Sequence, residues 1–345
     1  MSDDERPAPR VSAVVLGYRS EPWLERSVHA LLGSEGVAVD VVVVDNGCTD
    51  GAVERLRGTA GVTIVGDGTN LGFSGGCNLG VSVARGPFVA LVNGDLVVEP
   101  ETMARLVAVA QDPSIGVAAG SVRLAEDPEL LNSAGNEIHF LGFSWTGGFR
   151  ERAADRAIAR DVAGAMGALV VLRREVWERL GGFDAHYFAF HEDAELSWRC
   201  WQTGLRVRYV PQAVGVHRYE FDRIEQKLYL AERNRLAFVL TLWEARTLAV
   251  LAPAFLAVEL GVTAVAWRGG WLRQKVDGWR WLLRHRRWLR ERRRLLQAER
   301  TVSDRALARL MTGRLDAGNF PLPQRLRPAD SALAWYWVAA RRLLR

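Results

Sequence analysis

Short runs of β-branched, apolar residues alternate with helical segments along the first half of this chain. Residues 11–16 (VSAVVL) and 39–45 (VDVVVVD) are two such runs, and residues 22–32 between them repeat apolar side chains at helical spacing. Strands that are apolar at every position are typical of a parallel sheet covered by helices on both faces. This alternation therefore predicts an α/β fold with a doubly wound, mostly parallel sheet.

The same unit repeats further along the chain. Further helices are expected near 50–58, 76–84, 100–111 and 175–180, and further strands at 61–65, 88–92, 115–122 and 162–173. Between them, the glycine-rich segment 123–160 predicts loops or a hairpin, and residues 205–210 and 213–217 predict two short extended pieces. Open sheets of this kind bind ligands beyond the carboxyl ends of their strands.

Composition narrows the class of protein. The 345 residues are 49% hydrophobic and 25% charged, which is typical of a globular protein. The three cysteines form no CxxC pair, so neither a disulfide framework nor a zinc site is expected, and a reducing cytoplasm fits. Residues 1–10 are polar, lack the apolar core of a secretory signal and predict a short disordered tail.

Charge divides the chain into two parts. Residues 268–345 carry 20 basic and 6 acidic side chains, whereas residues 1–267 carry a net charge of −9. From about residue 226 the pattern predicts long helices, and residues 268–300 interleave basic side chains with four tryptophans. We interpret residues 226–345 as a helical extension that lies on an anionic inner-leaflet membrane surface.

Other interpretations of the extension stay open. Nucleic acid also binds basic stretches that contain aromatic residues, although no nucleic-acid fold is indicated elsewhere and this partner is unlikely. A solvated helical face that packs its tryptophans on the rest of the protein is the simplest alternative. Residues 247–267 approach the length of a membrane span but contain Pro253 and Glu259, so a buried or interfacial helix pair is equally compatible.

The stretch 181–199 (GGFDAHYFAFHEDAELSWR) is the strongest indication of chemistry. An aromatic approach leads directly into Glu192 and Asp193, after which a helical pattern continues. Carboxylates beside aromatic surface are costly unless they are paired, bound to metal or used in a reaction. Asp95 ends the apolar run of residues 91–95, and an acid at a strand end can face the same cleft.

Three further motifs contain candidate ligand-binding residues. In residues 41–51, Asp45 and Asn46 end a strand and could bind a base or ribose, or simply form an Asx turn. The glycines of residues 70–80 could bring amides to a phosphate, or form only a flexible loop. This loop is neither GxGxxG nor a Walker motif, which disfavours a nicotinamide cofactor.

A divalent metal is expected near the end of the strand at 88–92. The carboxylate of Asp95, in Asn93-Gly94-Asp95, suits Mg²⁺ or Mn²⁺, although a plain β-turn would give the same three residues. His217 follows an extended run and could be a second ligand, could pair with a phosphate or could be structural.

Together and in this order, these motifs resemble family 2 glycosyltransferases of the GT-A fold, in particular the bacterial rhamnosyltransferase-like branch. The resemblance rests on VVLGYRSEPWLERSVHALL, VVVVDNGCTDG, NLGFSGGCNLG, FVALVNGDL, VAGAMGALVVLRREVWERLGGFDAHYFAFHEDAELSWR and YLAERNRLAF, and it spans residues 11–240. It implies a nucleotide diphosphate sugar donor, a divalent metal (Mg²⁺ or Mn²⁺) and inversion at the anomeric carbon.

The resemblance also implies roles for single residues. Asp193 would deprotonate the acceptor hydroxyl with Glu192 as its partner, and Asp95 would hold the metal. The donor would be bound by residues of the upstream motifs, namely Asp45, Asn46, Asn70, Gly72, Phe73, Asn78, Asn93 and Asp95. Asn93-Gly94-Asp95 stands where many relatives have Asn-Pro-Asp or two acids, and Glu195 stands where Asp is more usual.

These interpretations predict a GT-A catalytic domain at 11–225 and the helical extension at 226–345. The expected activity is transfer of rhamnose or another hexose, from dTDP-rhamnose or a UDP-sugar, to a glycan or polyprenyl-linked acceptor in cell-envelope polysaccharide synthesis. The expected location is cytoplasmic, peripheral on the inner face of the plasma membrane, and whether residues 247–267 span the membrane stays open. Two rival interpretations are a nucleotide-binding oxidoreductase and a catalytically silent membrane-bound scaffold.

Overall fold

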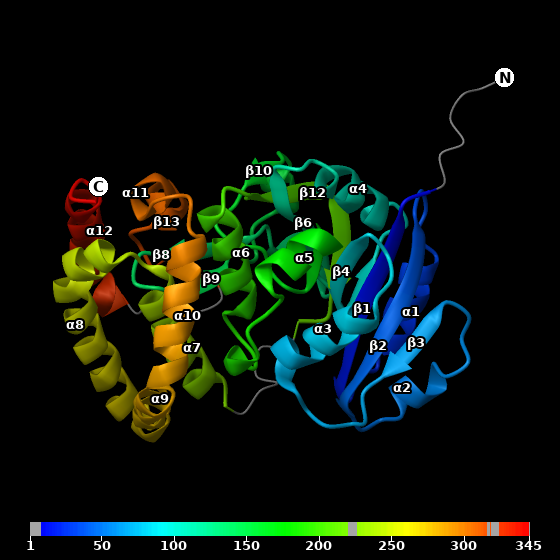
Figure 1. Ribbon diagram of the computed structural model, residues 1–345, viewed down its shortest axis with the longest axis horizontal. Helices are drawn as coiled ribbons and strands as arrows, with labels where there is room; N and C mark the ends of the chain where they lie inside the picture. The colour runs from blue at the N-terminus through cyan, green and yellow to red at the C-terminus, as the bar shows by residue number, and fades with distance from the viewer. Residues whose placement is uncertain (1–7, 220–225, 316–317, 319–323, 345) are drawn as a thin grey trace.

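A single mixed β-sheet with helices on both faces forms the body of the protein (Figure 1). The computed structural model describes residues 8–219, 226–315, 318 and 324–344. Within these residues the sheet comprises β1 (Arg10–Arg19), β2 (Ala38–Cys48), β3 (Val62–Val65), β4 (Phe88–Asn93), β5 (Leu96–Val98), β6 (Ile115–Leu124), β7 (Asp127–Ser133), β10 (Arg160–Asp161), β11 (Leu169–Arg173) and β12 (Arg206–His217).

The order of the strands follows the α/β prediction. The strands run β10-β12-β6-β11-β4-β1-β2-β3, with β5 beside β12 and β7 beside β6. The pairs β1–β2, β1–β4, β2–β3 and β6–β12 are parallel, whereas β11 is antiparallel to both β4 and β6. The helices of this body are α1 (Leu24–Leu32), α2 (Ala52–Arg55), α3 (Gly72–Val83), α4 (Thr102–Ala110), α5 (Arg174–Leu180) and α6 (Glu192–Gln202).

Both faces of the sheet are buried, which explains why its strands are apolar at successive positions. In β1, Val11, Ala13 and Val15 pack in the same core cluster as residues of α1, α2 and α4. The alternate residues Val14 and Leu16 pack in a second cluster with residues of α3, α5 and α6. Successive side chains of a strand point to opposite faces, so each face of β1 contributes to a separate core.

Several predicted boundaries change in the structure. Residues 1–7 of the predicted tail lie outside the described residues, and Arg10 already begins β1. The two extended pieces near the end of the sheet are one strand, β12, which continues across Pro211 through a shift in its pairing with β6. The expected hairpin within 123–160 is confirmed as β8 (Asn136–His139) and β9 (Ser144–Thr146), which pair antiparallel.

The predicted strand at 162–173 was wrong for its first half. Only Leu169–Arg173 form a strand, β11. In the irregular part, the amide of Ala165 donates to Ser197 Oγ (3.0 Å) and the amide of Gly167 donates to Asp193 Oδ2 (3.1 Å). Side chains of α6 therefore take up main-chain donors that a neighbouring strand would otherwise satisfy.

The C-terminal helices pack beside the sheet domain at the end that carries α6 (Figure 1). They are α7 (Lys227–Leu242), α8 (Ala245–Arg268), α9 (Leu272–Arg284), α10 (Arg286–Glu299), α11 (Asp304–Leu307) and α12 (Arg327–Ala340), with the short strand β13 (Met311–Thr312) pairing with β8. Apolar residues of α7, α10 and α12 belong to the same core cluster as α6. The predicted boundary at 225/226 adjoins residues 220–225, which lie outside the described residues.

A buried ion cluster joins α7, α8 and α9. Lys275 Nζ lies 2.5 Å from Glu232 Oε2 and 2.8 Å from Glu259 Oε2. Arg235 pairs with the same two carboxylates. Because each charge has opposite charges beside it, the cost of desolvation is offset and the inner face of α8 is fixed against α7 and α9.

The outer face of α8 is apolar and exposed. Within the described residues, α8 is the one helix that is long and apolar enough to cross a membrane, and little of it is buried. It is a single helix, so of the alternatives for residues 247–267 the helix pair was wrong. The neighbouring helices α9 and α10 expose a row of arginines, namely Arg273, Arg280, Arg284, Arg286, Arg287, Arg290 and Arg294.

Candidate active site

The acid pair predicted from the sequence lies in the first turn of α6. Asp193 is half-buried, and its Oδ2 accepts hydrogen bonds from the Gly167 amide (3.1 Å) and from Asn136 Nδ2 (3.2 Å). Its Oδ1 accepts from the Ala194 amide (2.7 Å). These donors hold the carboxylate in one orientation beside the segment that precedes β11.

Burial changes the protonation of both acids. Desolvation raises the pKa of Asp193, although hydrogen bonds from the amides of Gly167 and Ala194 and from Asn136 oppose it. Desolvation and the neighbouring charge of Asp193 together raise the pKa of Glu192 well above its ordinary value. The buried Glu192 Oε2 has no hydrogen-bond partner in the described protein. Both shifts favour the protonated form, and the larger one is at Glu192, so Glu192 holds a proton more readily than Asp193.

The segment that leads into these acids has a strained backbone. Phe188, Phe190 and His191 have φ values of 64°, 69° and 69°, in the left-handed region that bulky residues rarely adopt. The side chain of Asn234 in α7 holds this segment, because its Nδ2 donates to the carbonyls of Tyr187, Ala189 and Phe190 at 2.7–2.9 Å. Strained backbone of this kind is typical of functional sites whose surroundings fix it.

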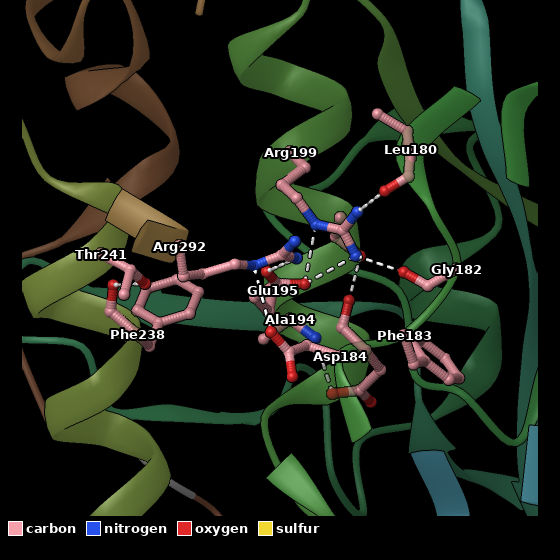
Figure 2. A network of polar contacts seen from close by, with 12 residues as sticks. Leu180, Gly182, Phe183, Asp184, Ala194, Glu195, Arg199, Phe238, Thr241 and Arg292 are labelled. Carbon is pink, nitrogen blue, oxygen red and sulfur yellow. Dashed lines mark hydrogen bonds and ion pairs between the residues drawn. The ribbon is translucent and has the colours of Figure 1, made fainter. Parts of the chain in front are cut away.

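A second set of contacts connects the acid helix to the C-terminal extension (Figure 2). Glu195 is fully buried and pairs with Arg199 of its own helix at 2.7 Å and with Arg292 of α10 at 2.6 Å. Arg292 also lies 3.2 Å from Asp184, which precedes the strained segment. Arg292 therefore contacts one residue before that segment and one residue after it.

The two predicted metal ligands, Asp95 and His217, lie in contact. His217 Nε2, at the end of β12, lies 3.0 Å from Asp95 Oδ1 and 3.3 Å from Asn93 Nδ2. The other ring nitrogen, Nδ1, lies 2.7 Å from Asn132 Oδ1. An imidazole nitrogen and a carboxylate oxygen are both ligands of divalent metals, and these two atoms already face each other, so the residues fit a divalent metal.

This pair is an incomplete coordination shell. Among the described residues, no group of three or more His, Cys, Asp or Glu side chains could hold a metal ion. A metal bound by Asp95 and His217 would need further ligands from substrate oxygens or water, which is typical of Mg²⁺ and Mn²⁺ sites that act on phosphates.

Segment 166–169 lies between the two acids. The Asn93 amide donates to the Ala168 carbonyl at 3.0 Å, two residues before Asp95. Next to it, Gly167 donates to Asp193 and packs so tightly that a Cβ there would lie 3.2 Å from Phe73 and 3.4 Å from the Asp193 Cβ. The ends of β4 and α6 thus adjoin through one short segment.

The first of the predicted donor loops is largely held by its own hydrogen bonds. Asp45 Oδ1 accepts from the amides of Gly47 (3.2 Å) and Cys48 (3.1 Å), which is the Asx-turn alternative. Asn46 is buried, accepts from the Leu71 amide (2.8 Å) and donates to the Gly72 carbonyl (3.2 Å). Asn46 thus joins the two predicted donor motifs to each other.

The second donor loop starts α3. Asn70 Oδ1 accepts from the Gly72 amide at 2.9 Å, and Gly72 has φ of +70°. A Cβ at Gly72 would lie 2.3 Å from the Phe188 carbonyl oxygen, so only glycine fits there. The loop is therefore in direct contact with the strained segment before the acids.

Asn78 has a different position from the one expected of a donor ligand. Its Nδ2 donates to the Phe183 carbonyl (2.8 Å) and its Oδ1 accepts from the Phe183 amide (3.0 Å). Both polar groups therefore bind main chain and fix α3 beside residues 182–184. Phe73 is half-buried and packs 6.0 Å from the Phe183 ring.

Sequence reasoning missed several residues that shape the site. Asp50 accepts from Ser20 Oγ, the Glu21 amide, Cys48 Sγ and the Ala52 amide. Partial desolvation would raise the pKa of Asp50, but these hydrogen bonds outweigh it and lower the pKa to about 2. Asp50 is the second aspartate of residues 45–51 (DNGCTDG), and this motif could have indicated its role. The other missed residues are Asn132, Asn136, Asn234 and Arg292, each of which contacts a residue 47 or more positions away in the sequence.

Comparison with solved structures identifies the fold. The mannosyltransferase PcManGT from Pyrobaculum calidifontis, solved with GDP-Man and Mn²⁺, aligns over 96% of this chain and 86% of its own, at 20% identity and TM-score 0.51. Staphylococcus aureus TarS 1–349 with UDP-GlcNAc aligns over 96% and 89%, at 15% identity and TM-score 0.54. GalNAc-T7 with UDP, GalNAc and Mn²⁺ aligns over 71% of this chain and 49% of its own, at TM-score 0.58. The GT-A fold expected from the sequence is confirmed.

Comparison of sequences identifies the family. The model of the glycosyltransferase-like family 2 matches residues 8–241, so the chain belongs to this family and is a glycosyltransferase. A similar protein is the N-acetylglucosaminyl-diphospho-decaprenol L-rhamnosyltransferase of Mycobacterium tuberculosis, 27% identical over 59% of this chain and 74% of its own length. The succinoglycan biosynthesis protein ExoO of Rhizobium meliloti is 29% identical over 39% of this chain and 37% of its own. The family does not support the rival interpretation as an oxidoreductase.

Proposed function

We propose that this protein is an inverting glycosyltransferase that moves a hexose or deoxyhexose from a nucleotide diphosphate sugar to a lipid-linked glycan acceptor. The observation that carries the proposal is the half-buried Asp193, whose carboxylate is held by Gly167, Asn136 and Ala194 beside the ends of β4 and α3. A fixed carboxylate with a raised pKa suits a general base.

The reaction needs one proton transfer and one displacement. Asp193 accepts the proton of the acceptor hydroxyl as its oxygen forms a bond to the anomeric carbon of the donor. The bond from that carbon to the diphosphate oxygen breaks on the opposite side, so the configuration inverts and the nucleoside diphosphate leaves with its electron pair. The neutral Glu192 beside Asp193 keeps a second negative charge out of the site.

The donor would lie on the loops at the ends of β2 and β4. Asp45 is proposed to bind the base or ribose, and the turn from Asn70 to Phe73 is proposed to face the diphosphate, with Asn46 and Asn78 holding these loops. Asp95 and His217 would hold a divalent metal, with Asn93 beside them. When bound, Mg²⁺ or Mn²⁺ supplies positive charge that stabilises the leaving diphosphate.

The donor is proposed to be dTDP-rhamnose, or otherwise a UDP-sugar. The similar rhamnosyltransferase of Mycobacterium tuberculosis supports rhamnose and also supports a polyprenyl diphosphate acceptor in cell-envelope polysaccharide synthesis. Thermal-shift titration with dTDP, UDP and GDP, with and without Mn²⁺, tests the donor site directly. We expect stabilisation by one nucleoside diphosphate that depends on Mn²⁺, and loss of that Mn²⁺ dependence in His217→Gln. A protein that no nucleotide stabilises would instead favour a catalytically silent scaffold.

The acceptor would be reached at the cytoplasmic face of the plasma membrane, to which the protein binds peripherally. The exposed apolar face of α8 and the exposed arginines of α9 and α10 support this location. Because Glu259 on the inner face of α8 pairs with Arg235 and Lys275, we infer that α8 lies along the bilayer surface and does not cross it. Sedimentation with phosphatidylglycerol vesicles that weakens as salt rises would support this inference, and absence of binding at low salt would contradict it.

A further inference from the structure

A cavity of about 420 Å³ lies between the strained segment and the C-terminal helices, outside the residues assigned to donor or metal. This volume is within the range of about 300–1,000 Å³ that is usual for ligand pockets. The residues that give the cavity its chemistry are His186, Phe188, Tyr229, Arg233, Trp281 and His285. They combine basic groups with aromatic rings, and among the described residues no acidic side chain lines the cavity.

The two histidines that line the cavity each have one ring nitrogen fixed. His186 Nδ1 lies 2.8 Å from Asp184 Oδ1, and His285 Nδ1 lies 2.8 Å from the Trp281 carbonyl oxygen. Both partners can only accept, so Nδ1 carries the proton in each ring. Among the described residues no protein atom is hydrogen-bonded to either Nε2, and the two ring centroids are 6.1 Å apart.

Arg233 adds a buried positive charge. Its side chain donates to the carbonyls of His186 and Tyr187 at 2.8 Å, and its guanidinium lies 4.2 Å from the centre of the Trp281 ring. No carboxylate in the described part of the chain is within ion-pair distance of it, although the residue is only 5% exposed. Burying a charge without a counter-charge is costly, and an anionic ligand in the cavity would compensate it.

The position of the cavity relates it to the active site. Phe188 lines the cavity, and its carbonyl accepts from the Ser74 amide of α3 at 3.0 Å. The same residue touches Gly72 in the predicted donor loop. On the opposite side the cavity is formed by α7 and α9, and α9 packs against the exposed apolar helix α8. The cavity therefore lies between the donor loop and the surface expected to meet the membrane.

We propose that this cavity binds the phosphate or diphosphate group of an isoprenoid-linked acceptor. The assignment rests on the proposed function and specifies where its acceptor would bind. Arg233 would donate to the phosphate oxygens, as would Nε2 of each histidine when its ring carries a second proton. The rings of Tyr229 and Trp281 would contact the first isoprene unit. The sugar attached to the phosphate would then extend past Phe188 toward Asp193.

Binding of farnesyl diphosphate to the full chain tests this assignment, with farnesol as the probe that lacks phosphate. We expect calorimetry to show at least tenfold tighter binding of farnesyl diphosphate than of farnesol. The double variant His186→Gln/His285→Gln should weaken farnesyl diphosphate binding about tenfold or more, because two contacts to charged oxygens are lost. His29→Gln is the matched control and should change nothing, because His29 is exposed on α1, and α1 lies at the opposite end of the molecule from α7 and α9 (Figure 1).

Two further measurements separate the possible failures. Equal binding of the two probes, or undiminished binding in the double variant, would overturn the assignment of the cavity. If phosphatidylglycerol vesicles competed with farnesyl diphosphate and lost their own binding in the double variant, the cavity would bind a bilayer headgroup and the acceptor assignment would fail. Nucleoside diphosphate binding with Mn²⁺, measured on the same proteins, reports the donor site, so its absence in the wild type would contradict the proposed function instead.

Discussion

Arg292 of α10 lies 2.6 Å from Glu195 of α6, and this ion pair joins the C-terminal extension to the helix that carries Asp193 (Figure 2). Glu195 is fully buried and Arg292 is largely buried, so the pair is poorly screened by solvent. Desolvation would lower the pKa of Arg292, but the charge of Glu195 outweighs it and raises this pKa, so the arginine stays charged. The extension is thereby part of the support of the proposed active site.

Removing this arginine should affect both stability and turnover. We expect Arg292→Met to lower the free energy of unfolding by about 3 kcal/mol, because Glu195 and Asp184 lose a charged partner. Turnover should fall by more than tenfold, with the Michaelis constant for the donor little changed. Urea unfolding and steady-state kinetics measure the two effects. Arg294→Met, an exposed arginine on the same helix, should stay within about 0.5 kcal/mol of the wild type, and an equal loss in that control would refute the specific role of Arg292.

The raised pKa of Glu192 has a definite consequence for stability. Its folded-state pKa is higher than its unfolded value, so the folded protein keeps a proton that the unfolded chain releases above pH 4.5. The contribution of Glu192 to stability therefore decreases as pH rises above 4.5. Glu192→Gln removes this ionisation, and we expect a free energy of unfolding at pH 7 equal to or above that of the wild type. A large loss of stability in this variant would mean that Glu192 is ionised in the folded protein.

The contribution of Glu232 to stability changes with pH in the opposite direction. Desolvation would raise the pKa of Glu232, but the charges of Arg235 and Lys275 outweigh it and lower this pKa to about 2. The contribution of ionised Glu232 to the free energy of unfolding is fully present above the unfolded pKa of about 4.5 and is lost as pH falls toward 2. The difference between the two pKa values corresponds to about 3 kcal/mol. We expect Glu232→Gln to destabilise the protein by this order at pH 7 and to have a flatter stability profile between pH 4.5 and 2. Urea titrations across this range, with exposed Glu299→Gln as the control, measure both effects.

Gly72 should be intolerant of any side chain. A Cβ would lie 2.3 Å from the Phe188 carbonyl oxygen, and φ of +70° is unfavourable for alanine. We expect Gly72→Ala to separate the donor loop from the strained segment and to weaken nucleotide binding at least tenfold in thermal-shift titrations. Gly58→Ala provides a comparison, because Gly58 also has a positive φ but meets no atom within 4 Å. Equal nucleotide affinity in both variants would show that the contact with Phe188 is unimportant.

The sequence predicted the sheet well because each strand can be recognised from its own run of residues. The apolar runs at β1, β2 and β4 are buried on both faces, so no tertiary information was needed to recognise them. The segment 162–168 was misjudged because its amides bind Asp193 and Ser197, which lie some thirty residues away. Apolar composition alone does not distinguish such a segment from a strand.

Within the candidate site, the sequence located the acids but not what holds them. Asp95 and His217 were predicted to approach each other, and the structure brings them to 3.0 Å. Asn78 was expected to face the donor, but both ends of its amide bind Phe183, which no local pattern reveals. A direct role for the remaining predicted donor ligands stays a prediction, since their contacts with a ligand depend on long-range geometry.

Turnover of Asp193→Asn is the most direct test of the proposed mechanism. The amide occupies the same space, and its oxygen can still accept from Gly167 and Asn136, although the Ala194 amide loses its acceptor. The amide cannot take a proton from an acceptor hydroxyl. We expect donor binding to persist and turnover to fall by about a hundredfold or more. Near-normal turnover of Asp193→Asn, in a protein that folds and binds nucleotide like the wild type, would contradict the assignment of Asp193 as the general base.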